Sequence, residues 1–109
     1  MSTISTHILD AVRGKPAAGV AIQLEQKIDG LWTVVGTGET DHDGRCHDMA
    51  PDSGAGIYRL IFAVGSYFAH HDRRSLYPEI SIAFAVDGSQ RYHIPLLLSD
   101  NSYTTYRGS

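Results

Sequence analysis

The chain has little cysteine and no basic segment, and these absences exclude several classes of protein. Its 109 residues include a single cysteine, Cys46. That count excludes an internal disulfide framework and a zinc site built from cysteines. The 9 lysines and arginines are outnumbered by 12 aspartates and glutamates, whereas a nucleic-acid-binding surface needs a basic stripe. We therefore expect no nucleic-acid partner.

Long hydrophobic runs are also missing. Apolar stretches such as Leu96-Leu97-Leu98 are far shorter than the roughly 18 residues that a membrane-spanning helix needs. Residues 1–7 have neither the basic nor the apolar region of a signal peptide. The chain is 42% hydrophobic, which is enough for a core in one domain of this length. We expect a single domain over residues 1–109, no membrane partner and a cytoplasmic location.

The chain does contain the alternation of apolar and polar residues that is typical of strands. Segments 20–25 and 31–37 show it, and Asp29-Gly30 between them predicts a hairpin turn. Residues 57–62 form another such segment. Residues 80–85 and 91–98 form a further pair, for which Asp87-Gly88 predicts a second hairpin. Pro95 lies inside the last segment and indicates an edge or a bulge there, because proline cannot donate to a ladder.

Short strands at residues 4–9 and 103–107 complete the pattern, and residues 66–72 predict one short helix with Ser66 as its N-cap. Arg73-Arg74, the only basic cluster, is expected in a solvated loop. Seven or eight strands with turn signals at short spacing predict an all-β fold: a two-sheet antiparallel sandwich of about eight strands with one short helix.

Two of the six histidines lie inside strand patterns. By alternation His7 shares a face with Ser5 and Leu9, and His93 shares one with Arg91 and Pro95. A rigid strand fixes the ring position, and an ordinary pKa near about 6.5 suits proton transfer at neutral pH. Both histidines are candidates for general acid-base catalysis. A half-buried structural histidine gives the same pattern, so the alternation alone leaves both interpretations open.

The other candidates for chemistry are weaker. His70-His71 are adjacent and cannot both face one ion on a helix without a third element. Residues 42–48 hold several histidine, aspartate and cysteine side chains, but this stretch is equally typical of a polar turn around Gly44. We expect no metal. Neither a nucleophile elbow nor a phosphate-binding loop is present in the sequence.

Two further features have both a structural and a functional interpretation. Arg45 follows the turn Asp41–Gly44 and is either a surface ion-pair partner or a planar fork aimed at an anionic or carbonyl-rich ring. The tail Tyr106-Arg107-Gly108-Ser109 continues a strand-like run where most termini fray.

Several ordered motifs resemble the 5-hydroxyisourate hydrolase family, the transthyretin-related enzymes of purine degradation. They are residues 5–10 (STHILD), 13–20 (RGKPAAGV), 43–45 (DGR), 77–80 (YPEI), 93–99 (HIPLLLS) and 103–109 (YTTYRGS). The resemblance runs from Ile4 to Ser109. The terminal tetrapeptide is its most specific part, because it distinguishes the hydrolases from transthyretin, the hormone carrier on the same scaffold. One departure is Asp100, which follows Ser99 where the family usually has proline.

The resemblance implies a transthyretin-like sandwich and a homotetramer with active sites in a channel between dimers. It implies hydrolysis of the cyclic amide of 5-hydroxyisourate to 2-oxo-4-hydroxy-4-carboxy-5-ureidoimidazoline, with no metal or organic cofactor. The implied catalytic residues are His7, Arg45 and His93. The implied substrate-binding residues are His7, Arg45, Tyr106, Arg107, Gly108 and Ser109.

In this mechanism His7 and His93 share the proton transfer, and the resemblance leaves open which ring is the base. The alternatives are a ligand carrier that uses the same channel without chemistry and a non-catalytic interaction module. A carrier for an apolar hormone has no use for two titratable rings and an arginine in its channel, so the matched polar residues favour the enzyme.

Overall fold

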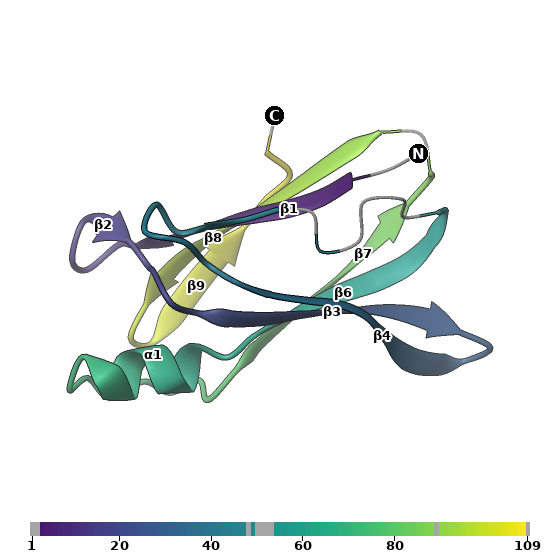
Figure 1. Cartoon of the computed structure of the whole chain (residues 1–109). Helices are drawn as coiled ribbons and strands as arrows, with labels where there is room; N and C mark the ends of the chain where they lie inside the picture. Colours follow the sequence, from purple (N-terminus) through teal and green to yellow (C-terminus); the bar gives the residue numbers. More distant parts are fainter. Residues whose placement is uncertain (1–2, 48, 50–53, 89, 109) are drawn as a thin grey trace.

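Two β-sheets packed face to face make up the molecule, with one short helix at one end (Figure 1). The structure is a computed structural model that describes residues 3–47, 49, 54–88 and 90–108. The first sheet consists of β1 (Thr3–Asp10), β2 (Lys15–Pro16), β5 (Arg45–Cys46), β8 (Arg91–Ser99) and β9 (Ser102–Thr105). The second consists of β3 (Ala21–Ile28), β4 (Leu31–Glu39), β6 (Gly56–Phe62) and β7 (Ile80–Val86), and the helix is α1 (Val64–His70). The expected sandwich with one short helix is confirmed.

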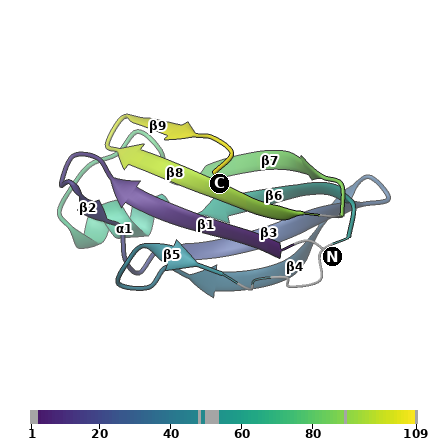
Figure 2. The ribbon, with the colours of Figure 1, turned by 90° about the horizontal axis from the view of Figure 1, so that it is seen from above.

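The first sheet contains one parallel pairing, between β1 and β8 (Figure 2). It places Ser5 opposite His93 and His7 opposite Pro95. All other pairings among the described strands are antiparallel. The antiparallel expectation therefore needs this one refinement. Alternation shows which face a side chain takes, but it does not show the direction of the neighbouring strand.

The first predicted hairpin is confirmed. β3 and β4 pair from Ile28 opposite Leu31 to Ala21 opposite Glu39, with a register shift after Leu24. Asp29 and Gly30 have φ values of 51° and 79°. Positive φ at both central residues is what a type I′ turn requires, and its twist matches that of the flanking strands.

The second predicted hairpin is wrong. β7 pairs with β6 in the second sheet, whereas β8 pairs with β1 and β9 in the first. The segment between them crosses from one sheet to the other, and the Asp87 amide donates to the hydroxyl of Tyr92 at 3.0 Å. A turn dipeptide indicates where the chain reverses, but it does not decide which strand becomes the hydrogen-bonding partner.

Pro95 lies on a central strand, at the point where pairing with β9 has ended. β9 reaches β8 only from Leu96 to Ser99. The carbonyl of Pro95 accepts a hydrogen bond from the hydroxyl of Thr105 at 2.8 Å. Its missing N–H therefore faces no strand partner, and the expected local edge is present at this residue.

The helix begins two residues earlier than predicted, and Ser66 does not cap it. Ala63 occupies the N-cap position and makes no side-chain cap hydrogen bond. Instead, the Gly65 amide in the first turn donates to the carbonyl of Pro78 at 2.9 Å. Val64 and Phe68, one turn apart, are buried against the sheets. Burial and a backbone partner from elsewhere in the chain thus fix a helix start that capping preferences alone misplace.

The buried residues of both sheets and the helix form one hydrophobic cluster. β1 shows why: its burial alternates along its whole length, with Ile4 and Ile8 inside and His7 on the outer side. This face-to-face arrangement leaves the outer side of β1 and β8 free for polar side chains. Among the described residues, no helix has the length and apolar character needed to cross a membrane.

Arg73 does not lie in a solvated loop as expected. Its side chain is only 15% exposed and forms ion pairs with Asp10 and Asp100. Asp10 is fully buried at the end of β1, and its Oδ2 also accepts a hydrogen bond from the hydroxyl of Tyr67 at 2.7 Å. Arg73 therefore ties the region after α1 to the ends of β1 and β8. Asp100, the departure from the family pattern, is one of its two partners.

Candidate active site

The two strand-borne histidines lie on the same outer face of the first sheet. His7 is on β1 and His93 is on the parallel neighbour β8, and both are half-buried. Arg45, at the start of β5, pairs with His7 from the other side of β1. β5, β1 and β8 thus bring together the three residues that the sequence singles out for catalysis.

The tautomer of His7 follows from its hydrogen bond. Its Nε2 lies 2.8 Å from the carbonyl oxygen of Asp43. Because a carbonyl oxygen only accepts, Nε2 carries the hydrogen. In the neutral ring the lone pair therefore belongs to Nδ1. His7 is held by the turn before β5, and its second nitrogen can accept a proton.

His93 is held in an environment that favours its neutral form. Its Nδ1 lies 2.9 Å from the hydroxyl oxygen of Ser5, the residue opposite it on β1. Burial lowers the pKa of His93, and the positive charges of Arg45, His7 and His47 lower it further. Both causes disfavour the imidazolium, so His93 is neutral over a wider pH range than an ordinary histidine.

The C-terminal tail packs against His93. The segment after β9 returns along β8 (Figure 2), and the Gly108 amide donates to the His93 carbonyl at 2.8 Å. A Cβ atom at Gly108 would lie 2.5 Å from Cδ2 of the His93 ring. Only glycine allows the tail to approach the ring this closely.

The turn before Arg45 is held by Asp41. One carboxylate oxygen of Asp41 accepts hydrogen bonds from the amides of Asp43 and Arg45, both at 2.9 Å. The bond from the Arg45 amide is the first cause of a lowered pKa at Asp41, which is thereby kept ionised. Gly44 completes the turn with φ 76°. Its carbonyl accepts from the Ile8 amide at 2.8 Å, which fixes β5 beside β1.

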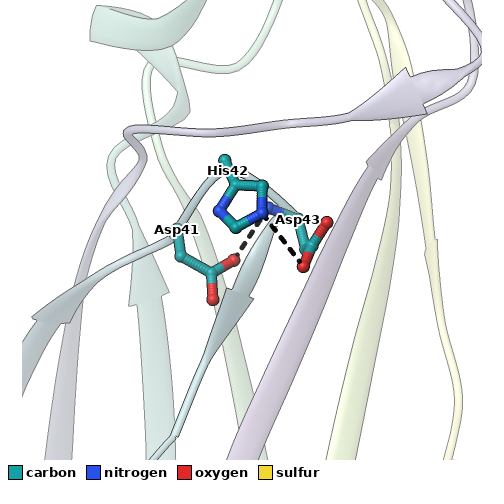
Figure 3. A group of neighbouring side chains, drawn as sticks. All are labelled: Asp41, His42 and Asp43. Atoms are coloured by element: carbon teal, nitrogen blue, oxygen red, sulfur yellow. Dashed lines mark hydrogen bonds and ion pairs between the residues drawn. The ribbon is translucent and has the colours of Figure 1, made fainter.

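The same turn contains three side chains with the composition of a metal site. Asp41, His42 and Asp43 bring one ligand atom each within 4.8 Å of one another (Figure 3). All three are exposed, and Asp41 already accepts the two amide hydrogen bonds of the turn. Cys46 is buried on the inner side, and Asp48 lies outside the described residues. The arrangement is that of a polar turn, and we assign no metal to it.

The terminal motif is divided between two places. Gly108 lies against His93, whereas the Arg107 guanidinium lies over the ring of Tyr92, 4.6 Å from its centroid, and donates to Gln90 at 2.6 Å. Tyr106 is 54% exposed, and with Arg107 it borders an apolar cleft of about 250 Å³ between β7 and β8. Ser109 lies outside the described residues. Of the three motif members that the structure describes, Gly108 is therefore the one that contacts a candidate catalytic ring.

Sequence reasoning missed two residues of this face, Ser5 and His47. Ser5 contacts His93, but the contact depends on the parallel register, which alternation does not show. His47 is exposed two residues after Arg45, and its charge acts on His93. The spacing Arg-x-His within a strand-like segment was the available signal, because residues two apart share a face.

Comparison with known proteins identifies relatives of this chain. The model of the HIUase/Transthyretin family matches residues 4–108. The 5-hydroxyisourate hydrolase of Salmonella typhimurium is 48% identical over 109 residues, covering 97% of this chain and 80% of that protein. Among solved structures, the Klebsiella pneumoniae 5-hydroxyisourate hydrolase has a TM-score of 0.88 and 37% identity, with 100% of each chain covered. Sea bream transthyretin in complex with thyroxine has a TM-score of 0.91 and 35% identity, with 96% and 93% covered.

Proposed function

We propose, from the premise that this chain belongs to the HIUase/transthyretin family, that His7, Arg45 and His93 catalyse its reaction. The chain is an enzyme, a 5-hydroxyisourate hydrolase that acts in urate degradation. The single observation that carries our assignment of roles is the hydrogen bond from His7 Nε2 to the Asp43 carbonyl. It fixes which nitrogen of this ring accepts a proton.

Hydrolysis of the cyclic amide has three requirements. A water oxygen forms a bond to the carbonyl carbon, the carbonyl oxygen takes up negative charge, and the carbon–nitrogen bond then breaks with a proton passing to the nitrogen. The first and last events need a group that accepts and returns a proton, and the second needs fixed donors.

His7 fits the proton-transfer role. Its Nδ1 carries the lone pair, and the Asp43 carbonyl stabilises the imidazolium that forms when water is deprotonated. The same proton then passes from Nδ1 to the leaving nitrogen. One ring thus serves as base in the first step and as acid in the second.

His93 and Arg45 fit the stabilisation of charge. Burial and the neighbouring positive charges lower the pKa of His93, which suits a neutral donor. In our proposal the Ser5 hydroxyl, 2.9 Å from Nδ1, donates to that nitrogen, so that Nε2 carries the hydrogen and donates to the carbonyl oxygen as its charge develops. Arg45, opposite His7, supplies a planar fork for the ring oxygens. This division of roles refines the expectation that both histidines transfer protons.

The tail and a second copy of the chain would complete the site. We propose that Tyr106, Arg107, Gly108 and Ser109 line the substrate pocket and that four chains assemble with sites between dimers. Supporting this, the outer face of β1 and β8 is open in the single chain, with Arg45 and Tyr106 exposed. Light scattering should give about 48 kDa, four times the 11.9 kDa of one chain.

We further propose that residues 1–109 function as one domain and that the enzyme acts in the cytoplasm. The single hydrophobic cluster shared by both sheets and the helix supports the first proposal. The resemblance to enzymes of purine degradation supports the second, and cell fractionation tests it.

The decay of freshly generated 5-hydroxyisourate tests the function directly. Ultraviolet absorbance is followed with and without the protein, before and after treatment with a chelator. We expect faster decay that survives chelation. No acceleration would contradict the hydrolase assignment, and activity lost on chelation would contradict a metal-free mechanism.

One observation favours a second candidate function. The sea bream transthyretin structure, which contains thyroxine, overlaps this chain with a TM-score of 0.91. A carrier of this kind would bind thyroxine without accelerating the decay of 5-hydroxyisourate. Three polar side chains on the outer face, His7, Arg45 and His93, argue against it, because an apolar ligand leaves their hydrogen-bonding groups unpaired.

A further inference from the structure

A second hollow lies beside the catalytic histidines, at the beginning of β1 and β8. It has a volume of about 280 Å³ and is lined by Thr3, Ile4, Ser5, His47 and Arg91. Arg91 and Thr3 are opposite each other at the start of the parallel pair. The roles assigned to His7, Arg45 and His93 leave this hollow unused.

The hollow is continuous with the candidate active site. Ser5 belongs to both, because its hydroxyl oxygen lies 2.9 Å from Nδ1 of His93. His47 lines the hollow, and its positive charge is one of the causes that lower the pKa of His93. A ligand held between His93 and Arg45 therefore borders this hollow at Ser5.

The side chains of Arg91 and His47 have no hydrogen-bond or ion-pair partner in the part of the chain that the structure describes. Both residues are exposed, and the backbone of Arg91 pairs with Thr3 in the ladder, so only its guanidinium is left for a ligand. By contrast Arg59, Arg73 and Arg107 each have an acceptor. The Arg91 fork beside the Thr3 hydroxyl presents donors in the arrangement that recognises a carboxylate.

The reaction creates such a group. When water adds to the amide carbon and the carbon–nitrogen bond breaks, that carbon becomes a carboxylic acid and the nitrogen takes one proton. The acid then loses its proton to solvent at neutral pH. The substrate is a closed ring without a carboxylate, whereas the product carries one.

We propose that this hollow is a carboxylate subsite, in which Arg91 and His47 bind the carboxylate formed on ring opening. This inference rests on the proposed function for the source of the ligand, but the site itself is defined by its own residues. The negative charge of the carboxylate moves from the neutral His93 toward Arg91. This movement separates the product from the catalytic groups and determines how strongly the product inhibits.

A pair of stable ring compounds tests the subsite without turnover. Orotate and uracil share a pyrimidine ring and differ by one carboxylate, so calorimetric titration of the whole protein with each isolates the contribution of that group. We expect orotate to bind about fivefold more tightly than uracil, as for one exposed charge-assisted contact.

Arg91→Gln should remove this preference, and Arg74→Gln, the same change at an exposed arginine outside the hollow, should leave it intact. Equal binding of the two compounds, or a preference that persists in Arg91→Gln, would overturn the proposal.

Progress curves with 5-hydroxyisourate test whether the ligand is the product. In Arg91→Gln we expect the product inhibition constant to rise about fivefold and to rise more than KM does. If KM rises as much as the inhibition constant, the arginine binds the closed ring and the product assignment is wrong. Either outcome requires that the wild-type protein opens the ring. If the hydrolase assignment itself were wrong, neither the wild type nor any variant would do so.

Discussion

β1 and β8 carry a polar assembly at each end, and the two assemblies differ in how their charges are satisfied. At the far end Asp10 is fully buried and accepts hydrogen bonds from Tyr67, from Arg73 and from two backbone amides. At the near end the outer face carries His7, His93 and Arg45. Among the described residues, no carboxylate forms an ion pair with any of these three.

The difference separates a structural network from a site. A buried carboxylate with full hydrogen bonding stabilises the fold only while every partner is present. A cluster of positive and titratable groups without a carboxylate does not stabilise the fold, and it is typical of a position where a ligand supplies the missing acceptor. The parallel pairing of β1 and β8 holds both assemblies, so each can be altered while the other stays intact.

Removing the buried carboxylate should produce the largest effect. In Asp10→Ala, Arg73 loses one of its two ion-pair partners and Tyr67 loses its acceptor. We expect the free energy of unfolding to fall by about 3 kcal/mol or more, as when one partner of a buried pair is deleted. Urea denaturation measures it, and Glu39→Ala at an exposed strand end should change stability by less than about 0.5 kcal/mol. A loss as small as that of the control would mean that the network is not what holds α1 to the sheets.

Removing the base should abolish most activity and leave the network intact. In His7→Asn the amide nitrogen can still donate to the Asp43 carbonyl, but the side chain cannot accept a proton at neutral pH. We expect turnover to fall about 100-fold or more with an unchanged thermal midpoint. His42→Asn, in the exposed turn, is the matched control. Retained turnover in His7→Asn would remove this ring from the mechanism.

The two assemblies also differ in how far the sequence alone predicts them. Alternation on β1 and the turn signature before Arg45 are local, and they place both His7 and Arg45 on the outer face of the first sheet. The contact between Ser5 and His93 joins residues 88 apart in the chain. It depends on a parallel register that no local pattern contains.

The paired network is less predictable still. Arg73 meets Asp10 across 63 residues, and the sequence around Arg73 has the polar character of a solvated loop. The helix start and the partner of β8 were mispredicted for the same reason. Tertiary burial and sheet pairing, not local preference, decide them.

Acid should selectively remove the stability that the buried network around Asp10 contributes. Burial by itself would raise the pKa of Asp10, but the hydrogen bonds from Arg73 and Tyr67 outweigh it and lower the pKa from 3.8 to about 2. The carboxylate therefore contributes stability that is complete above pH 3.8 and is lost as the pH falls toward 2. The expected loss is about 2 kcal/mol. Urea denaturation of wild type and Asp10→Asn between pH 5 and pH 2 measures it as a shrinking difference, and a constant difference would contradict the assignment.

Replacing the planar guanidinium of Arg45 should affect substrate binding more than turnover. Arg45→Lys keeps the charge and loses the planar pair of donors, so we expect KM to rise about tenfold with a smaller change in kcat. Steady-state rates with 5-hydroxyisourate measure the two separately. Arg74→Lys provides the same exchange outside both assemblies, and an unchanged KM in Arg45→Lys would contradict the role of a substrate clamp.

The smallest expected effect tests whether the unpaired charges of the site act on one another. Burial lowers the pKa of His93 first, and the positive charge of Arg45 is the next cause. Arg45→Gln removes that charge, so protonation of His93 becomes easier and its pKa should rise toward the ordinary 6.5. NMR titration of the His93 ring protons measures the shift, and Lys27→Gln makes the same change of charge on the other sheet. In our proposal neutral His93 donates to the carbonyl oxygen. The acid limb of the pH profile of kcat/KM should therefore move to higher pH together with the His93 pKa. If the acid limb moves while the His93 pKa does not, or if that pKa does not respond to Arg45, the coupling between Arg45 and His93 is wrong, and burial with the charges of His7 and His47 accounts for the neutral ring.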